Sequence, residues 1–323
     1  MKKILLCWLA AATALTAGAQ SNEWQDAGVN AVNRMPMHGS WFAYESPEAA
    51  QTGDKTLSER FVTLNGNWKF NWVRDADQRP TDFFRVGYND KGWNDMPVPG
   101  LWELNGYGDP VYLNVGYAWR GWFKNDPPHV PVEQNHVGSY RRTVDIPAAW
   151  AGRQIVAHFG SVTSNIYLWV NGRYVGYSED SKLEAEFDLT PYVKPGRNLI
   201  AFQVFRWCDG TYLEDQDFWR FSGIARGVTL TARDKAHLKD VRITPTLDAD
   251  YRDAQLHVEV ETTPRVKSVG LTLLDAAGEA VAEQQIMPAG GKAGCLFRVA
   301  DPAKWSAEAP NLYTLRIDVS DGR

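Results

Sequence analysis

Short segments of alternating apolar and polar residues recur along most of this chain, separated by frequent turns. Residues 61–64 and 68–72 flank one Asn-Gly pair, and residues 166–170 and 174–177 flank another. An Asn-Gly pair between two such segments is typical of a tight β-hairpin. Long stretches with a helical period are absent from the sequence. The pattern therefore predicts an all-β chain that folds as a β-sandwich or jelly roll.

The first residues have the composition of a secretory signal peptide. Lys2 and Lys3 precede an apolar run over residues 4–15, and small residues at 17–19 fit cleavage before Gln20. The run is too short to span a bilayer as a permanent helix. We therefore expect residues 1–19 to be removed and the mature chain to be exported, to the periplasm or outside the cell, without a membrane span.

Charge and cysteine content exclude several classes of function. The formal net charge is -5 and the sequence has no basic block, which argues against a nucleic-acid partner. Only Cys208 and Cys295 remain after the signal peptide, far apart in the sequence. Neither a disulfide framework nor a zinc site with closely spaced ligands is expected from them.

The densest cluster of ionisable residues lies in residues 206–228. Glu214, Asp215 and Asp217 fall within four positions, and Trp219 and Arg220 follow them directly. Like charges this close require a cation, an arginine or hydrogen-bond donors nearby. Carboxylates beside aromatic rings are also typical of sites for sugar hydroxyls and apolar sugar faces. The stretch indicates a sugar or metal site, and the alternative interpretation is a solvated acidic turn between two strands.

Residues 97–131 differ in composition from the strands around them. Aromatic side chains alternate there with many glycines and prolines, and the stretch is too irregular for regular structure. We predict a long functional loop. A lid of aromatic residues over one end of the sandwich core is a second interpretation, and it is compatible with the first.

The composition changes again near residues 233–240, where we place a domain boundary. Later segments alternate as strands do but contain far fewer aromatic residues, as in an immunoglobulin-like sandwich. Residues 320–323 have the composition of a hairpin turn without a return strand, so we expect this sandwich to be incomplete at its C-terminus. The predicted division is a signal peptide over residues 1–19, a jelly-roll domain over residues 20–234 and an immunoglobulin-like domain over residues 235–323.

Several motifs in order resemble the N-terminal part of the β-galactosidases of glycoside hydrolase family 2, and they cover nearly the whole mature chain. The motifs are Asn65-Gly66-x-Trp68-x-Phe70, Val98-Pro99-Gly100-Leu101-Trp102, Tyr112-x-Asn114-Val115-x-Tyr117, Trp169-Val170-Asn171-Gly172, Asp209-Gly210-x-Tyr212-Leu213-Glu214-Asp215-Gln216-Asp217-x-Trp219-Arg220 and Trp305-Ser306-Ala307-Glu308-x-Pro310-Asn311. The resemblance implies a sugar-binding jelly roll, an immunoglobulin-like domain and then a TIM barrel with the catalytic glutamates. The acidic run favours galactose over the glucuronic acid or mannose of related enzymes.

The resemblance also implies roles for individual residues. Asn114 and Asp217 match positions that project from the jelly roll to the barrel and contact the galactosyl ring, and the position of Asp217 also helps to hold a sodium ion. A second, structural site for magnesium or calcium is implied by matching positions with oxygen ligands. These are Glu23, Asp26, Val29 through its carbonyl, Glu179 and Asp209. The alternative is that they are unrelated surface acids.

Retaining glycosidases need two carboxyl groups about 5 Å apart. The resemblance places both in the barrel, so we assign no catalytic residue to this chain and do not favour Glu214 with Asp217 as a local pair. The expected function is that of the N-terminal part of an exported β-galactosidase, inactive alone, with no organic cofactor and a homo-oligomeric parent enzyme. The alternatives are a free-standing carbohydrate-binding module and a structural or docking domain without a ligand.

Overall fold

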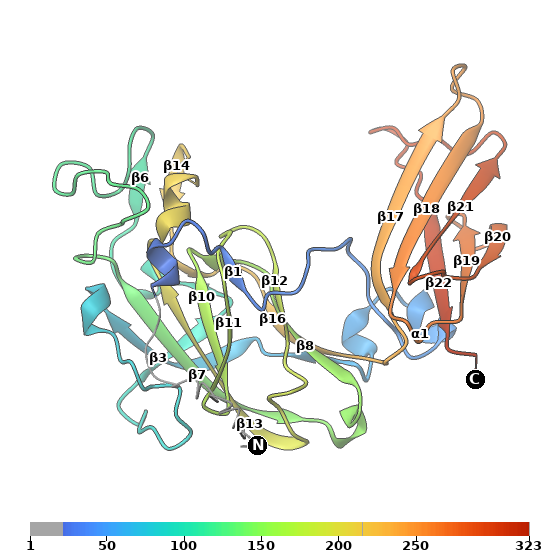
Figure 1. The fold of residues 1–323 in the computed structure, drawn as a ribbon. Coiled ribbons are helices and arrows are strands. Elements are labelled where there is room, and N and C mark those ends of the chain that lie inside the picture. Colours follow the sequence, from blue (N-terminus) through green and yellow to red (C-terminus); the bar gives the residue numbers. More distant parts are fainter. Residues whose placement is uncertain (1–21, 215, 323) are drawn as a thin grey trace, which may run out of the picture.

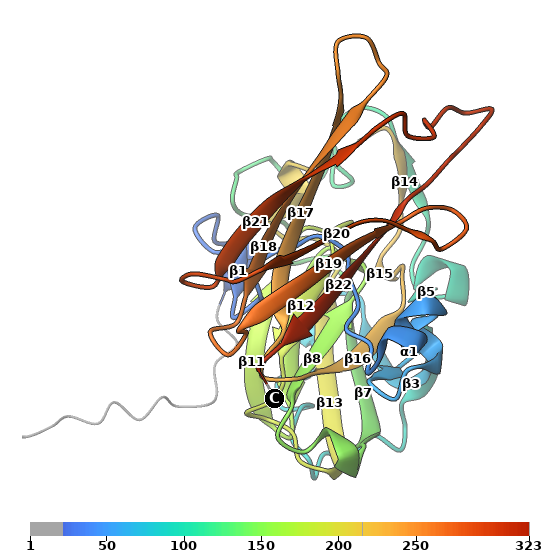
Figure 2. The same ribbon diagram turned by 90° about the vertical axis from the view of Figure 1, so that its right-hand side faces the viewer.

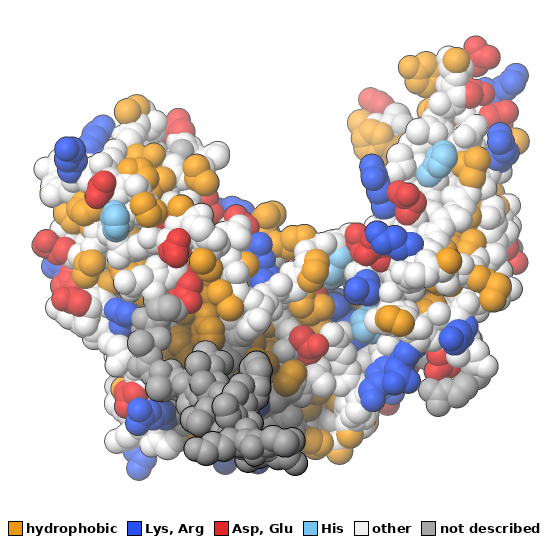
Figure 3. Space-filling view, in the orientation of Figure 1, with side chains coloured by type: hydrophobic (Ala, Val, Ile, Leu, Met, Phe, Trp, Pro, Cys, Tyr) orange, Lys and Arg blue, Asp and Glu red, His pale blue; other side chains and the backbone are white. Residues whose placement is uncertain are grey.

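The computed structural model describes residues 22–214 and 216–322, so the predicted signal peptide lies outside the described residues. It confirms the predicted all-β class, a jelly-roll sandwich followed by an immunoglobulin-like sandwich (Figure 1). In the space-filling view of the same face, the surface is hollowed between the two sandwiches (Figure 3). None of the helices in the described ranges is long and apolar enough to cross a membrane.

Two antiparallel sheets form the first sandwich. The larger sheet has the strand order β1-β11-β10-β13-β7-β3-β4 and the smaller sheet has the order β12-β8-β16-β2. The larger sheet contains β1 (Ala31–Val32), β3 (Gly66–Val73), β4 (Asn94–Val98), β7 (Val137–Ile146), β10 (Ile166–Val170), β11 (Arg173–Ser178) and β13 (Gly196–Phe205). The smaller sheet contains β2 (Phe61–Thr63), β8 (Gln154–Phe159), β12 (Ala185–Asp188) and β16 (Val228–Arg233).

Aromatic side chains fill the space between these two sheets. Tyr140 and Phe202 of the larger sheet stack with ring centroids 4.4 Å apart. Phe202 also contacts Phe159 of the smaller sheet edge to face, with centroids 5.5 Å apart. Trp68 and Leu230 belong to the same buried cluster. Rings of this size bury large apolar areas, so this layer supplies much of the hydrophobic stabilisation of the sandwich.

The outer face of the larger sheet is covered as well. Tyr167, Trp169 and Phe205 lie in a second buried cluster with Trp24 of the N-terminal arm and Trp119. All of β10 is therefore buried, and the alternation of a half-exposed strand does not hold there. Trp119 comes from residues 97–131, so this stretch covers part of the sandwich, in agreement with the lid interpretation.

One predicted hairpin is wrong. The Asn-Gly pair at 65–66 joins β2 of the smaller sheet to β3 of the larger sheet, and these strands do not pair with each other. The chain crosses between the sheets because Leu64 and Trp68 are both buried in the core that separates them. The backbone of Leu64 and the side chain of Asn65 both hydrogen-bond to the backbone of Val228, which fixes the crossing to β16.

The second predicted hairpin is confirmed. Asn171 and Gly172 have φ values of 51° and 82° and connect β10 to β11 through the Val170–Arg173 pair. Positive φ at both central residues is the geometry of a type I′ turn, which Asn-Gly adopts readily.

The second sandwich has two three-stranded sheets, which face the viewer in Figure 2. One contains β17 (Leu238–Leu247), β18 (Ala254–Thr262) and β21 (Lys292–Val299), and the other β19 (Ser268–Leu274), β20 (Ala280–Ile286) and β22 (Thr314–Ser320). Val258, Leu271 and Phe297 are buried between them. Trp41 of the N-terminal arm packs against this core and lies under the Arg233 guanidinium, 4.6 Å from it, so the arm bridges the two sandwiches.

Short elements surround the first sandwich. A small sheet contains β5 (Gly100–Leu101), β9 (Val162–Thr163) and β15 (Gly223–Ile224), and a two-stranded ribbon contains β6 (Val111–Leu113) and β14 (Phe218–Arg220). The helical turns are η1 (Glu23–Gln25), α1 (Pro47–Gln51), η2 (Lys55–Leu57), η3 (Ala76–Gln78), η4 (Glu103–Asn105), η5 (Ala148–Trp150) and η6 (Asp209–Tyr212). The β6–β14 ribbon projects from one end of the sandwich (Figure 1).

Candidate functional site

The β6–β14 ribbon brings Asn114 and Asp217 together. The strands are antiparallel, and Leu113 pairs with Phe218 at the end of the ladder. Asn114 follows Leu113 and Asp217 precedes Phe218, so both residues lie directly beyond the last pair, at the same end of the ribbon. Both side chains are exposed. An amide and a carboxylate therefore lie together on an open surface, where they can donate to and accept from hydroxyl groups.

Tyr112 holds Asp217 in place. Its hydroxyl donates a hydrogen bond to Oδ1 of Asp217, with 2.6 Å between the oxygens. Tyr112 pairs with Trp219 across the ribbon, and their rings contact edge to face at 5.6 Å. The hydrogen bond to Asp217 raises the pKa of Tyr112, so the phenol stays protonated as the donor. The sequence analysis did not identify this contact, although Tyr112 lies two residues before Asn114 and hence on the same face of the strand.

Glu214 has a structural role that differs from that of Asp217. Its carboxylate accepts hydrogen bonds from the backbone nitrogen and from the hydroxyl of Ser181. These two bonds tie the end of η6 to the loop after β11. The Glu214 carboxylate is thus engaged by Ser181, whereas the Asp217 carboxylate accepts from Tyr112.

A second cluster of ionisable side chains lies beneath the N-terminal arm. One side-chain donor atom from each of Glu179, Cys208 and Asp209 lies within 4.8 Å of the others. Glu179 is buried after the end of β11, and Asp209 begins η6. Glu179 accepts a hydrogen bond from the hydroxyl of Tyr177, at 2.5 Å. A Cβ added to Gly210 would come within 2.7 Å of Oε2 of Glu179, so a residue without a side chain is needed there.

The electrostatics of this cluster are unfavourable when no cation is bound. Burial raises the pKa of Glu179 to about 8, the hydrogen bond from Tyr177 opposes this rise, and the charge of Asp209 adds to it. Burial also raises the pKa of Asp209. Oδ1 of Asp209 is buried without a hydrogen-bond partner among the described residues. Two carboxyl groups lie together here, and one of their oxygens has no hydrogen-bond partner among the described residues. They suit a divalent cation that prefers oxygen ligands.

The remaining predicted ligands lie on the arm that crosses this cluster. The η1 turn containing Glu23 is anchored by stacking of Trp24 on Phe205, with ring centroids 4.9 Å apart. The hydroxyl of Tyr167 donates to Oε2 of Glu23 at 3.1 Å. Asp26 is close enough for its charge to raise the pKa of Asp209.

Among the residues that the structure describes, Glu23 and Asp26 do not belong to the group within 4.8 Å, although the arm containing them packs beside it. The backbone nitrogen of Val29 donates to the carbonyl of Asp26, which folds the arm back in a turn. Cys208 was not predicted as a member of this group. Burial raises the pKa of its thiol, so it is a neutral neighbour of the two carboxyl groups.

Two family models match consecutive parts of this chain. A family model described as "Glycosyl hydrolases family 2, sugar binding domain" matches residues 61–234. A second model, described as "Glycosyl hydrolases family 2", matches residues 236–323.

Curated relatives and solved structures carry two different enzyme names. A β-galactosidase of Halalkalibacterium halodurans is 39% identical over 92% of this chain and 29% of its own length. One of Aeromonas hydrophila is 40% identical over 93% of this chain and 30% of its own length. The chain thus spans less than a third of the length of these relatives. The structure of a β-glucuronidase of an uncultured Clostridium species covers 82% of this chain and 44% of its own, with a TM-score of 0.61 and 23% identity, which supports the fold alone.

Proposed function

This chain belongs to glycoside hydrolase family 2, and on that premise we propose that it is the N-terminal, sugar-facing part of a β-galactosidase. The parent enzyme removes terminal β-linked galactose with retention of configuration. The chain supplies binding residues, and the catalytic carboxyl pair comes from the barrel that the resemblance implies. Identity of 39% and 40% to β-galactosidases supports galactose as the substrate sugar over glucuronic acid.

The observation that carries the proposal is the position of Asn114 and Asp217, each one residue beyond the last pair of the β6–β14 ladder, Leu113 with Phe218. The Asp217 carboxylate accepts from sugar hydroxyls, and the Asn114 amide supplies both a donor and an acceptor. Tyr112 occupies one oxygen of Asp217 and so orients the carboxylate, leaving its other oxygen for a hydroxyl group or a sodium ion. A sugar bound here would be held from one side by this chain.

Glu179 and Asp209 are the residues that would hold a magnesium or calcium ion, with Glu23, Asp26 and the carbonyl of Val29 as further ligands from the arm. Such an ion would neutralise the buried carboxyl groups and fasten the arm to η6. This site stabilises the sandwich that carries the ribbon and takes no part in bond cleavage. Export of the mature chain and assembly of the parent enzyme into a homo-oligomer belong to the same proposal.

The purified chain, residues 22–323, is expected not to hydrolyse a chromogenic β-galactoside, because the proposal assigns both catalytic carboxyl groups to the barrel. Release of nitrophenol is followed over hours at high protein concentration, with a complete β-galactosidase as the positive control. Turnover that disappears in Asp217→Ala would contradict the proposal, since a local carboxylate would then be performing the chemistry.

A further inference from the structure

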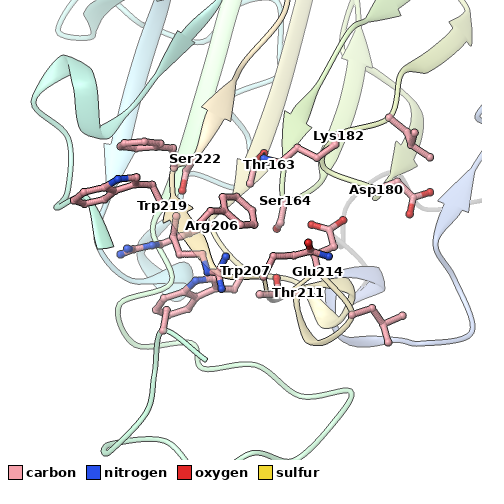
Figure 4. Close-up of a pocket in the computed structure, with 17 residues that line it drawn as sticks. Thr163, Ser164, Asp180, Lys182, Arg206, Trp207, Thr211, Glu214, Trp219 and Ser222 are labelled. Atoms are coloured by element: carbon pink, nitrogen blue, oxygen red, sulfur yellow. The ribbon is translucent and has the colours of Figure 1, made fainter. Parts of the chain in front are cut away.

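A cavity of about 360 Å³ lies beside β14, between η6 and the loops that follow β9 and β11 (Figure 4). Small-molecule sites commonly measure about 300–1,000 Å³, so its size suits a compact ligand. In the part of the chain that the structure describes, neither Asn114 nor Asp217 lines this cavity. The cavity adjoins the proposed galactosyl contacts, since Gln216 and Phe218, the two neighbours of Asp217, are among its lining residues.

Aromatic rings form part of the cavity wall. Trp219 is 50% exposed and stacks on Phe221, with ring centroids 6.0 Å apart and planes inclined by 16°. Trp207 lies deeper and is buried. A half-exposed indole supported by a second ring presents a flat apolar surface that is already ordered. Such a surface can pack against the C–H groups on one face of a sugar ring.

Polar groups of mixed type complete the lining. Hydroxyl groups come from Thr163, Ser164, Thr211 and Ser222, and charged groups from Asp180, Lys182, Arg206, Glu214 and Arg220. Figure 4 shows Trp219 and Arg206 on one side of the cavity and Asp180 and Glu214 on the other. The lining thus offers hydrogen-bond donors and acceptors, and charges of both signs. Such a lining suits a ligand with many hydroxyl groups better than a highly charged ligand.

Arg206 is the buried member of the charged residues that line this cavity. Its side chain is only 8% exposed, and its Nε has no hydrogen-bond partner among the described residues. Its Nη1 lies 3.3 Å from Nδ1 of His136, and its guanidinium lies 4.9 Å from the ring of Trp207. Burial and the charge of Arg206 lower the pKa of His136 to about 3, so the imidazole stays neutral and accepts from the arginine. Nη2 of Arg206 also donates to the carbonyl of Asp109 at 3.5 Å, and the charges of Glu103 and Asp109 favour the charged form of the guanidinium.

We propose that this cavity binds one pyranose unit of a glycan, independently of Asp217. The sugar ring stacks on Trp219, and its hydroxyl groups exchange hydrogen bonds with the surrounding hydroxyl, carboxylate and guanidinium groups. The site gives the chain a glycan contact that does not depend on a catalytic barrel. It would let the protein hold a polysaccharide beside the point of cleavage.

The test is a ligand-observed NMR titration of residues 22–323 with galactose and, in parallel, with galacturonic acid. We expect saturable binding of at least one sugar, weakened about fivefold by Trp219→Ala, because the stacking contact with the indole ring is lost. Trp305→Ala is the matched control, since Trp305 is 64% exposed and does not line the cavity. Circular dichroism spectra confirm that each variant is folded.

Asp217→Asn separates this proposal from the proposed function. Binding that persists in Asp217→Asn and weakens in Trp219→Ala supports the cavity, whatever the activity of the parent enzyme. Binding that is lost in Asp217→Asn and retained in Trp219→Ala assigns the sugar to the ribbon and overturns the cavity site. Failure of both sugars to bind at concentrations up to about 100 mM, about 100-fold above a Kd of about 1 mM, also overturns it.

Discussion

Replacing Asp217 by alanine is expected to lower kcat/KM for a β-galactoside by about 100-fold in an enzyme that contains this chain. Hydrogen bonds to a charged group contribute about 1.5–3 kcal/mol, and Asp217 would also lose its role as a cation ligand. The measurement uses a chimera in which residues 22–323 replace the matching first part of the Halalkalibacterium halodurans β-galactosidase. Michaelis–Menten kinetics on a nitrophenyl β-galactoside give kcat and KM separately.

Two further variants of the chimera test whether the loss of activity is specific to Asp217. Glu133→Ala removes an exposed carboxylate in the same half of the sandwich and should leave kcat/KM unchanged. Tyr112→Phe removes only the hydroxyl that holds Oδ1 of Asp217 and should lower kcat/KM by a few fold. Equal activity of Asp217→Ala and Glu133→Ala would show that the ribbon does not contact substrate.

Addition of magnesium or calcium to the chain stripped with EDTA is expected to raise its melting temperature by about 5–10 °C. A ligand at 100 times its Kd stabilises the folded state by about 2.7 kcal/mol, and each kcal/mol shifts Tm by about 2–4 °C in a domain of this size. The ion would relieve the repulsion between Glu179 and Asp209 and satisfy Oδ1 of Asp209. Thermal unfolding followed by circular dichroism measures the shift.

Asp209→Asn provides the decisive comparison for the cation. It removes the charge of the half-buried Asp209 beside Glu179, so the variant should melt at or above the Tm of the stripped wild type and should respond little to either ion. Asp82→Asn, at an exposed aspartate outside the cluster, should respond as the wild type does. A full response in Asp209→Asn would place the cation elsewhere.

The fold class could be predicted from the sequence because alternation and turn residues are local properties. The pairing of strands could not, as the two Asn-Gly pairs show. Asn171-Gly172 closes a hairpin because β10 and β11 lie in one sheet, whereas Asn65-Gly66 crosses between sheets because Leu64 and Trp68 are both buried in the core. Local turn chemistry is the same in both cases, and burial of the flanking residues decides which sheet each strand joins.

The candidate site could be predicted only where a motif identified it. Asn114 and Asp217 were chosen from the resemblance, and the register of β6 with β14 explains why they lie at the same end of the ribbon. The hydrogen bond from Tyr112 and the position of Cys208 beside Glu179 depend on contacts between distant segments. The same holds for the cavity at Trp219 and Arg206, whose lining comes from several loops and has no sequence signature.

The substrate preference of the chimera tests the central claim most directly. The chimera is assayed with nitrophenyl β-galactoside and nitrophenyl β-glucuronide at equal concentrations, beside the parent Halalkalibacterium halodurans enzyme. We expect hydrolysis of the galactoside with kcat/KM within about tenfold of that of the parent enzyme, and no measurable turnover of the glucuronide. A folded chimera that is inactive on the galactoside, or that prefers the glucuronide, would contradict the assignment of this chain to a β-galactosidase.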